Sequence, residues 1–287
     1  MPVFSTQYHD LYYRTIGNSN QPPLLLLHGF LGSYQDFTPI TSALAKDFYC
    51  IVPDLPGHGK TQSNTYTFPS TANSLLALLD HLNIQQTHLL GYSMGGRLAL
   101  YLVCEFPSYF LKGVIESASP GLKTAEERAE RRKSDRIIAS KLQTTPLPSF
   151  LSQWYSNPLF ASLNHHPNKY ETMRQRRENN SPKELCHALE GLGTGKQPSL
   201  WKKVKQVQQP LLLIVGTLDT KFVAINHEMK DCLKASSNAQ LKIVKGCGHN
   251  IHLEAPNLYA HLVKMFLYEQ FEPSETSQKK TSQKKSP

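Results

Sequence analysis

Short, wholly apolar runs alternate along this chain with longer segments in which apolar residues recur at helical spacing. The apolar runs predict strands at Pro23–His28, Phe48–Asp54, Thr87–Ser93, Leu111–Ser119, Pro210–Asp219 and Ala239–Gly248. The intervening segments predict helices at Tyr34–Lys46, Pro69–Leu82, Gly95–Phe106, Phe222–Lys234 and Pro256–Tyr268. Strands that are apolar on both faces are typical of a parallel sheet. The alternation therefore predicts an α/β fold, a mostly parallel sheet with helices on both faces.

One long interval interrupts this alternation. Between Ser119 and Pro210 the chain is rich in charged residues and helix formers and contains no convincing strand. We interpret residues 121–209 as an inserted helical cap over the strand ends, and residues 1–120 with 210–270 as the core of the fold. Residues 271–287 are polar and of low complexity, which predicts a disordered tail.

Composition narrows the class of protein further. The 287 residues suit a single α/β domain with an insertion, and no apolar run approaches the roughly 20 residues that span a bilayer. The N-terminal segment lacks the basic and apolar regions of a signal peptide. Five scattered cysteines indicate neither a disulfide framework nor a zinc cluster and suit a reducing compartment. We expect a cytoplasmic protein without membrane contact.

The net charge of +9 is concentrated in the predicted cap, where 16 lysines and arginines face 8 acidic residues. Such a surplus predicts an anionic ligand or surface. Nucleic acid is a weaker explanation, because the segment lacks the basic and aromatic repeats of known nucleic-acid modules. We therefore expect a small anionic substrate as the partner.

The segment Gly91-Tyr92-Ser93-Met94-Gly95 stands where a predicted strand gives way to a predicted helix. G-x-S-x-G in that context is typical of a nucleophile elbow, in which a tight turn exposes the serine at the edge of the sheet. The N-terminus of the following helix favours negative charge beside the serine. Ser93 is therefore the predicted nucleophile or base.

Two later strand ends supply partners in the chain order that this elbow requires. Asp219 and His249 each follow a predicted strand, and the ends of parallel strands converge at one sheet edge. We predict that His249 takes the Ser93 proton while Asp219 orients the imidazole. Asp219 could instead be a helix N-cap. His252 is expected to pack at a helix start, and a zinc site at His249 and His252 would need further ligands that are not nearby.

The strand that ends in His28-Gly29-Phe30 completes the predicted site. The backbone amides of Phe30 and Met94 are the candidate oxyanion hole, one from this loop and one from the residue after the serine. His28 itself is expected to be structural. No metal or organic cofactor is expected.

Several motifs carry a family resemblance along nearly the whole chain. "HGFLGS", "PDLPGHGKT", "GYSMGGRLAL", "GTLDTKF" and "GCGHNIHLEAP" resemble the α/β-hydrolase superfamily. "SPGLKTAEERAERRKSD", "WYSNPLFASL" and "RRENNSP" in the cap resemble the 2-succinyl-6-hydroxy-2,4-cyclohexadiene-1-carboxylate synthases. The resemblance implies an α/β-hydrolase fold that carries a lyase of menaquinone or phylloquinone biosynthesis. Such an enzyme releases pyruvate from a substrate with three carboxylates, and its serine abstracts a proton rather than forming an acyl-enzyme.

Candidate substrate contacts follow from position and from the resemblance. Arg97 lies one helical turn after Ser93, and a buried arginine requires a carboxylate, of the protein or, as we favour, of the substrate. The resemblance implies that Arg128 and Arg177 also clamp carboxylates, although the register around residues 174–177 stays open by a few positions. The alternative is a solvated helix face with Glu–Arg pairs, which we favour for Arg131, Arg132 and Arg136.

Three aromatic residues complete the predicted site. Trp154 and Phe160 would line a pocket for the substrate ring or pack the cap core, and Tyr92 would donate to a carboxylate or pack. The alternative function is a serine esterase or carbon–carbon bond hydrolase that acts on an acidic substrate. A non-catalytic receptor would not need the intact triad of Ser93, Asp219 and His249. Oligomeric state is left open.

Overall fold

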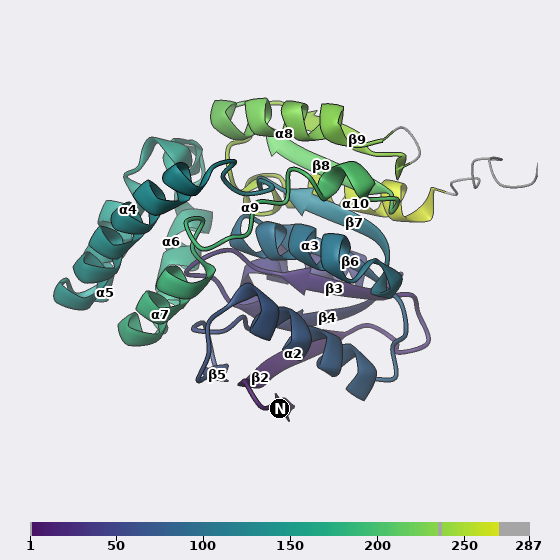
Figure 1. Ribbon diagram of the computed structural model, residues 1–287, viewed down its shortest axis with the longest axis horizontal. Coiled ribbons are helices and arrows are strands. Elements are labelled where there is room, and N and C mark those ends of the chain that lie inside the picture. Colours follow the sequence, from purple (N-terminus) through teal and green to yellow (C-terminus); the bar gives the residue numbers. More distant parts are fainter. Residues whose placement is uncertain (1, 235–236, 270–287) are drawn as a thin grey trace, which may run out of the picture.

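The computed structural model describes residues 2–234 and 237–269, and its centre is one twisted sheet (Figure 1). The strands run in the order β1-β2-β4-β3-β6-β7-β8-β9, and β5 pairs with β2. From β4 to β9 neighbouring strands are parallel, whereas β2 is antiparallel to β4. The bounds are β1 Val3–Ser5, β2 His9–Ile16, β3 Pro23–Leu27, β4 Tyr49–Pro53, β5 Gln62–Ser63, β6 Thr87–Tyr92, β7 Phe110–Glu116, β8 Leu211–Gly216 and β9 Gln240–Val244.

Every strand that the apolar runs predict is present, and the fold class is confirmed. The three strands that the sequence did not predict, β1, β2 and β5, form the antiparallel edge. The longest of them, β2, mixes His9, Asp10 and Arg14 with apolar residues and is half-buried over its last three positions. A strand with one partly solvated face gives no continuous apolar run, which is why the pattern does not reveal it.

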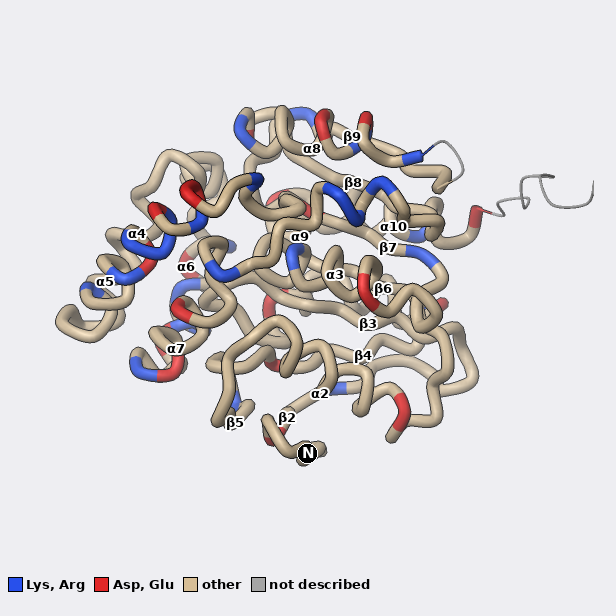
Figure 2. The backbone as a smooth tube through the Cα atoms, viewed as in Figure 1, with Lys and Arg blue, Asp and Glu red and all other residues tan. Residues whose placement is uncertain are grey.

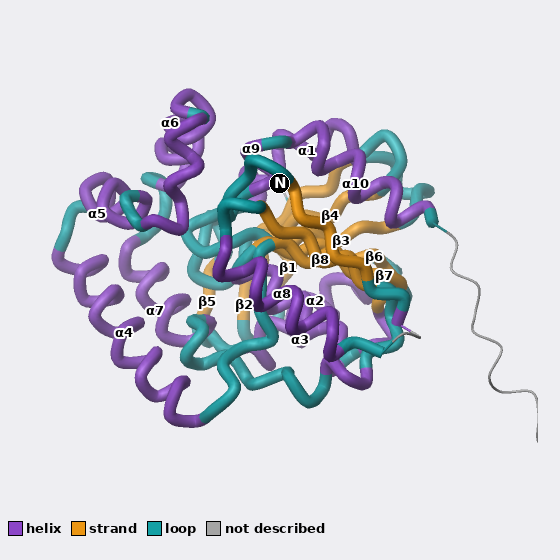
Figure 3. Tube along the Cα trace, turned by 90° about the horizontal axis from the view of Figure 1, so that it is seen from above, coloured by secondary structure: helices purple, strands orange, loops and turns teal. Residues whose placement is uncertain are grey.

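Helices cover both faces of the sheet (Figure 3). One face carries α1 (Thr38–Leu44), α9 (Ile251–Glu254) and α10 (Pro256–Tyr268), and the other carries α2 (Phe68–His81), α3 (Met94–Glu105) and α8 (Thr220–Cys232). Each layer encloses its own core of fully buried side chains. Tyr259 and Phe37 are prominent on the α1 and α10 side, and Leu75 and Leu98 on the α2 and α3 side.

Residues 121–209 separate β7 from β8 and hold α4 (Ala125–Thr144), α5 (Leu147–Tyr155), the 3-10 segment η3 (Pro158–His165), α6 (Pro167–Arg177) and α7 (Pro182–Leu192). We call residues 121–209 the cap. The cap has a third core, which also takes in Leu31 and Leu253 from core loops. Lys and Arg positions are prominent along α4 (Figure 2). The predicted disordered tail, residues 271–287, lies outside the described residues.

The loops after β3, β6, β8 and β9 leave the sheet at the edge beside the cap (Figure 1). These loops hold Phe30, Ser93, Asp219 and His249, so the topology gathers residues that are far apart in sequence. Among the described residues, no helix combines the length and apolarity needed to cross a membrane.

Candidate active site

Ser93 occupies a strained turn between β6 and α3. Its φ of 51° and ψ of −108° lie outside the regions that a side-chain-bearing residue usually adopts. Its backbone N–H donates to the Glu116 carbonyl at 2.9 Å, which ties the turn to β7. Glycine is required on both sides, because a Cβ at Gly91 would lie 2.4 Å from the Gly95 carbonyl oxygen, and one at Gly95 would lie 2.0 Å from that of Leu27. The turn therefore has the geometry of a nucleophile elbow.

His249 links Ser93 to Asp219. Its Nε2 lies 3.0 Å from Ser93 Oγ and its Nδ1 lies 2.7 Å from Asp219 Oδ2. Because the carboxylate can only accept, Nδ1 carries the proton and Nε2 is free to accept from the serine. Asp219 does stand at the N-cap position of α8, but its side chain makes no capping bond and turns to the imidazole instead. The three side chains thus form a hydrogen-bonded relay.

Two buried carboxylates fix the loop that carries His249. Glu254 accepts from the backbone N–H of Gly248 at 2.9 Å and of Asn250 at 3.3 Å, on either side of the histidine. Glu116 accepts from the backbone N–H and from Nδ1 of His252. His252 is therefore a buried partner of Glu116 and not a competitor for Ser93. Among the described residues no group of three or more His, Cys, Asp or Glu side chains could hold a metal ion.

The Phe30 loop lies against the serine. A Cβ added at Gly29 would lie 3.5 Å from Ser93 Cβ, so the backbone before Phe30 passes directly beside the elbow. In the part of the chain that the structure describes, the backbone N–H groups of Phe30 and Met94 have no acceptor within the molecule. Two unsatisfied donors next to a nucleophile suit an oxyanion hole.

A cavity of about 380 Å³ opens over Ser93 and His249, between the sheet edge and the cap. Phe30, Trp154 and Phe160 supply aromatic walls, and the Trp154 ring meets Phe30 edge-on with centroids 5.5 Å apart. Phe160 also meets the His249 ring edge-on. The structure thus brings the predicted Trp154 and Phe160 to the same space as the triad.

Arg97 lines this cavity and has no carboxylate partner within it. Its Nη1 donates to the Leu192 carbonyl at 2.9 Å, and its guanidinium lies 5.9 Å from the centre of the Phe68 ring. Among the described residues it forms no ion pair. Burial and the neighbouring charge of Arg131 lower the pKa of Arg97. A partly buried cation without a counter-ion is suited to bind an anion.

The predicted cap contacts are placed differently. Arg128 is not among the residues that line the cavity, and its Nη1 reaches the Leu122 carbonyl at 3.3 Å. Arg131, which we expected on a solvated face, does line the cavity and pairs with Asp135 at 2.7 Å. The two arginines are three residues apart on α4, and Arg131 is the one that the helix packing directs inward. The surplus of positive charge in the cap is the only sequence signal that could have pointed to it.

Arg177 and Tyr92 are buried beneath the site rather than exposed to the cavity. Arg177 forms an ion pair with Asp36 at 2.8 Å, with both side chains only 4% exposed, and it also contacts the Tyr155 hydroxyl. This differs from the carboxylate clamp that the family resemblance implies, because the guanidinium already has its carboxylate. The Tyr92 ring packs against His252 and under Gly29, and burial raises its pKa. Of the two roles open to Tyr92, the structure favours packing.

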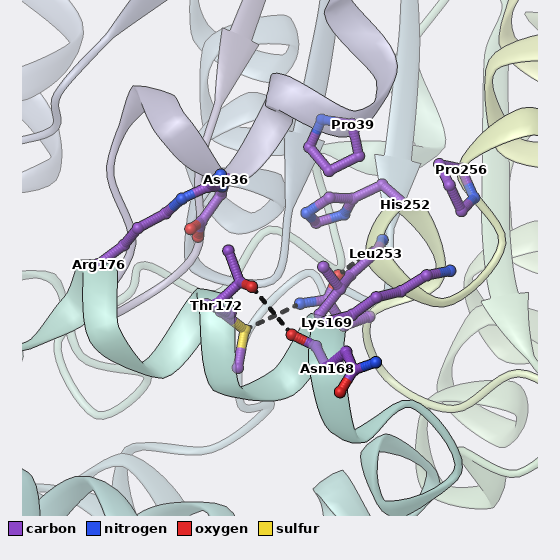
Figure 4. A pocket seen from close by; sticks show the side chains of 11 residues that line it. Asp36, Pro39, Asn168, Lys169, Thr172, Arg176, His252, Leu253 and Pro256 are labelled. Atoms are coloured by element: carbon purple, nitrogen blue, oxygen red, sulfur yellow. Dashed lines mark hydrogen bonds between the residues drawn. The ribbon is translucent and has the colours of Figure 1, made fainter.

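A second cavity, of about 290 Å³, lies behind the His249 loop between α6 and α9 (Figure 4). It contains neither Ser93 nor His249. Lys169 on α6 donates to the Glu254 carbonyl at 3.0 Å, and Asn250 Nδ2 lies 3.9 Å from Met173 Sδ. The cavity therefore marks a seam at which the cap contacts the loop that carries the histidine.

A nucleophile elbow with a histidine and an aspartate at the edge of a parallel sheet is typical of α/β-hydrolase-fold proteins. The sequence-family model for the alpha/beta hydrolase fold matches residues 22–256 of this chain. A synthase from Pectobacterium atrosepticum, named 2-succinyl-6-hydroxy-2,4-cyclohexadiene-1-carboxylate synthase, is 34% identical over 86% of this chain and 94% of its own. A protein from Bacillus subtilis (strain 168) bears the same name provisionally. It is 37% identical to this chain over 88% of this chain and 92% of its own length. MenH from S. aureus superposes with a TM-score of 0.83 at 31% identity, over 91% of this chain and 98% of that one. The chain belongs to the 2-succinyl-6-hydroxy-2,4-cyclohexadiene-1-carboxylate synthase family of α/β-hydrolase-fold proteins.

Proposed function

We propose that this protein eliminates pyruvate from 2-succinyl-5-enolpyruvyl-6-hydroxy-3-cyclohexene-1-carboxylate and so forms 2-succinyl-6-hydroxy-2,4-cyclohexadiene-1-carboxylate, in menaquinone or phylloquinone biosynthesis. The observation that carries the proposal is Arg97, a partly buried cation one helical turn after Ser93 that has no carboxylate partner among the described residues. Arg131 lines the same cavity. The family's substrate brings three carboxylates, which would supply the missing counter-charges.

The triad supplies the base. His249, oriented by Asp219, accepts the hydroxyl proton of Ser93 through Nε2. Ser93 Oγ then removes the ring proton adjacent to the succinyl ketone, because that proton is acidified by the carbonyl. The proton remains with the Ser93 and His249 pair, and no acyl-enzyme forms.

The remaining electron pair leaves with pyruvate. As the C–H bond breaks, negative charge develops on the ketone oxygen, where the N–H groups of Phe30 and Met94 would stabilise it. The electrons then return through the ring alkene, and the bond from the ring carbon to the enolpyruvyl oxygen breaks. The protonated His249 can return its proton to the departing enolate. Trp154 and Phe160 would pack against the ring.

A serine esterase or carbon–carbon bond hydrolase for acidic substrates is the alternative function of the same triad. A hydrolase for neutral acyl chains would gain nothing from Arg97, whose partial burial costs free energy in the absence of an anion. We also retain the proposed division of the chain, with residues 1–120 and 210–270 as the core and residues 121–209 as a cap that roofs the cavity.

The test is to mix purified protein with the enolpyruvyl substrate and to follow pyruvate with a coupled dehydrogenase. We expect one pyruvate for each substrate consumed, and no release with Ser93→Ala. A p-nitrophenyl ester assayed in parallel separates the two functions. Rapid ester hydrolysis with no pyruvate would replace the lyase by the hydrolase.

A further inference from the structure

Leu31, the residue after the candidate oxyanion donor Phe30, is held in an unusual backbone conformation. Its φ of 68° lies in the left-handed region, which is unfavourable for a residue with a side chain, and its side chain is fully buried. Such conformations persist only where the surroundings hold them. The question is which groups hold this one.

Side chains from two other segments bond both polar backbone groups of Leu31. Its N–H donates to His58 Nε2 at 3.1 Å, from the loop after β4, and its carbonyl accepts from Asn180 Nδ2 at 2.8 Å, from the cap. The preceding carbonyl, of Phe30, accepts from Arg177 Nη1 at 3.2 Å. The peptide group between Phe30 and Leu31 is thus fixed at both its oxygen and its nitrogen.

Asn180 does more than bond Leu31. Its Oδ1 accepts from the Gly59 backbone N–H at 2.8 Å, so one side-chain amide joins the Phe30 loop to the loop after β4. Asn180 is only 8% exposed. Its side-chain oxygen acts as an acceptor and its side-chain nitrogen as a donor. Aspartate has the shape but not the donor, and alanine has neither.

We propose that Asn180 is a positioning residue for catalysis, which holds Leu31 in its left-handed conformation and thereby keeps the Phe30 N–H directed at the oxyanion site. The inference rests on the proposed function in so far as Phe30 and Met94 form the hole. Asn180 does not contact the cavity, so its loss should impair the chemical step and leave substrate binding intact. The cap then has a second task besides roofing the cavity.

The kinetic test compares Asn180→Ala and Asn180→Asp with the control Asn179→Ala. Asn179 is exposed, and among the described residues its side chain donates only to the carbonyls of Gln175 and Arg176 in the preceding helix. Loss of a whole oxyanion donor lowers kcat by about 100- to 1000-fold, so a misdirected donor should cost roughly 10- to 100-fold. We expect that loss in both Asn180 variants, with KM within about threefold of wild type, and no change in Asn179→Ala.

A second readout follows the loop itself. Hydrogen exchange of the segment 28–33, measured by mass spectrometry on the full-length protein, should be at least about tenfold faster in both Asn180 variants than in wild type or Asn179→Ala. Asn180→Asp keeps the acceptor for the Gly59 N–H. The kinetic and hydrogen-exchange measurements can therefore both be made on Asn180→Asp if Asn180→Ala does not fold. Unchanged exchange in a folded Asn180 variant, or a kcat equal to that of wild type, overturns the inference. If wild type itself releases no pyruvate, the proposed function fails, while the exchange experiment still decides whether Asn180 holds the loop.

Discussion

Arg177 and Asp36 form an ion pair in which Nη2 and Oδ2 are 2.8 Å apart and both side chains are almost completely buried. Removing one member leaves the other charged and unpaired in the interior. We therefore expect Arg177→Met to lower the free energy of unfolding by about 3–5 kcal/mol, as measured by urea denaturation. In the double variant Asp36→Asn with Arg177→Met the loss should be smaller, because no unpaired charge remains. A single variant as stable as wild type would contradict this account of the pair.

Ser93→Ala tests the base. The variant removes the hydroxyl that lies 3.0 Å from His249 Nε2. Loss of one member of a triad commonly lowers kcat by several orders of magnitude. The melting temperature should change little, because the elbow is held by its backbone bond to Glu116. The measurement is pyruvate release in single-turnover and steady-state assays. Activity within tenfold of wild type would remove Ser93 from the mechanism.

The core strands and the triad could be predicted because both depend on short-range signals. A wholly apolar run predicts a buried parallel strand, and polar residues at the ends of such strands gather at one sheet edge, as Ser93, Asp219 and His249 do. The mixed pattern of β2 carries no such signal. The antiparallel edge was therefore missed.

The cap contacts could not be predicted in the same way, because they depend on how a helix is docked. Arg128 and Arg131 have the same chemistry three residues apart, and only the packing of α4 decides which one lines the cavity. The partner of Arg177 is Asp36, which lies in the 3-10 segment Tyr34–Phe37, 141 residues earlier. No local pattern connects them.

Arg131→Ala and Arg128→Ala form a matched pair for the cavity. Arg131 lines it, whereas Arg128 does not and donates instead to the backbone carbonyl of Leu122. We expect Arg131→Ala to raise KM for the anionic substrate at least tenfold, since a charge-assisted contact contributes about 1.5–3 kcal/mol. Arg128→Ala should stay within about twofold of wild type. The reverse order of effects in steady-state kinetics would show that Arg128, rather than Arg131, contacts the substrate.

Two buried histidines make stability depend on pH. Burial lowers the pKa of His28 to about 4 and of His58 to about 3, and each accepts a backbone N–H through Nε2. In the unfolded chain both would titrate near 6.5. The unfolded state therefore binds more protons than the folded state below that pH. The contribution of these two histidines to the free energy of unfolding is fully present above about pH 6.5 and is lost as the pH falls towards 4 and 3.

The slope near pH 5 should be about 1.4 kcal/mol per pH unit for each histidine, added to the effect of other groups. Urea denaturation at pH 7, 6 and 5 measures it. His58→Gln removes one titrating group and keeps an acceptor side chain, so its slope should be smaller by one histidine's share. An unchanged slope in this variant would show that His58 does not titrate between the two states.

Substitutions of Arg97 distinguish a residue that contacts the substrate from one that only stabilises the fold. If Arg97 pairs with a substrate carboxylate, Arg97→Ala leaves that carboxylate in a dry, unpaired site, which costs on the order of 2–5 kcal/mol. This corresponds to roughly 30- to several-thousand-fold in kcat/KM. Arg97→Lys should recover part of the loss, because the ammonium restores the charge but not the planar pair of donors.

The folded protein should tolerate the change. Burial and the charge of Arg131 lower the pKa of Arg97 to about 9, so the side chain stays charged at neutral pH but its cation is less favourable in the folded protein than in water. Among the described residues, the substitution removes one side-chain hydrogen bond, the one to the Leu192 carbonyl. We expect Arg97→Met to melt at the wild-type temperature or above it. Hydrolysis of a small neutral ester, where detectable, should be unaffected by Arg97→Ala, Arg97→Lys or Arg97→Met. If instead the variants melt far lower while the folded fraction keeps its kcat/KM, Arg97 is a structural residue, and recognition of the anion falls to Arg131.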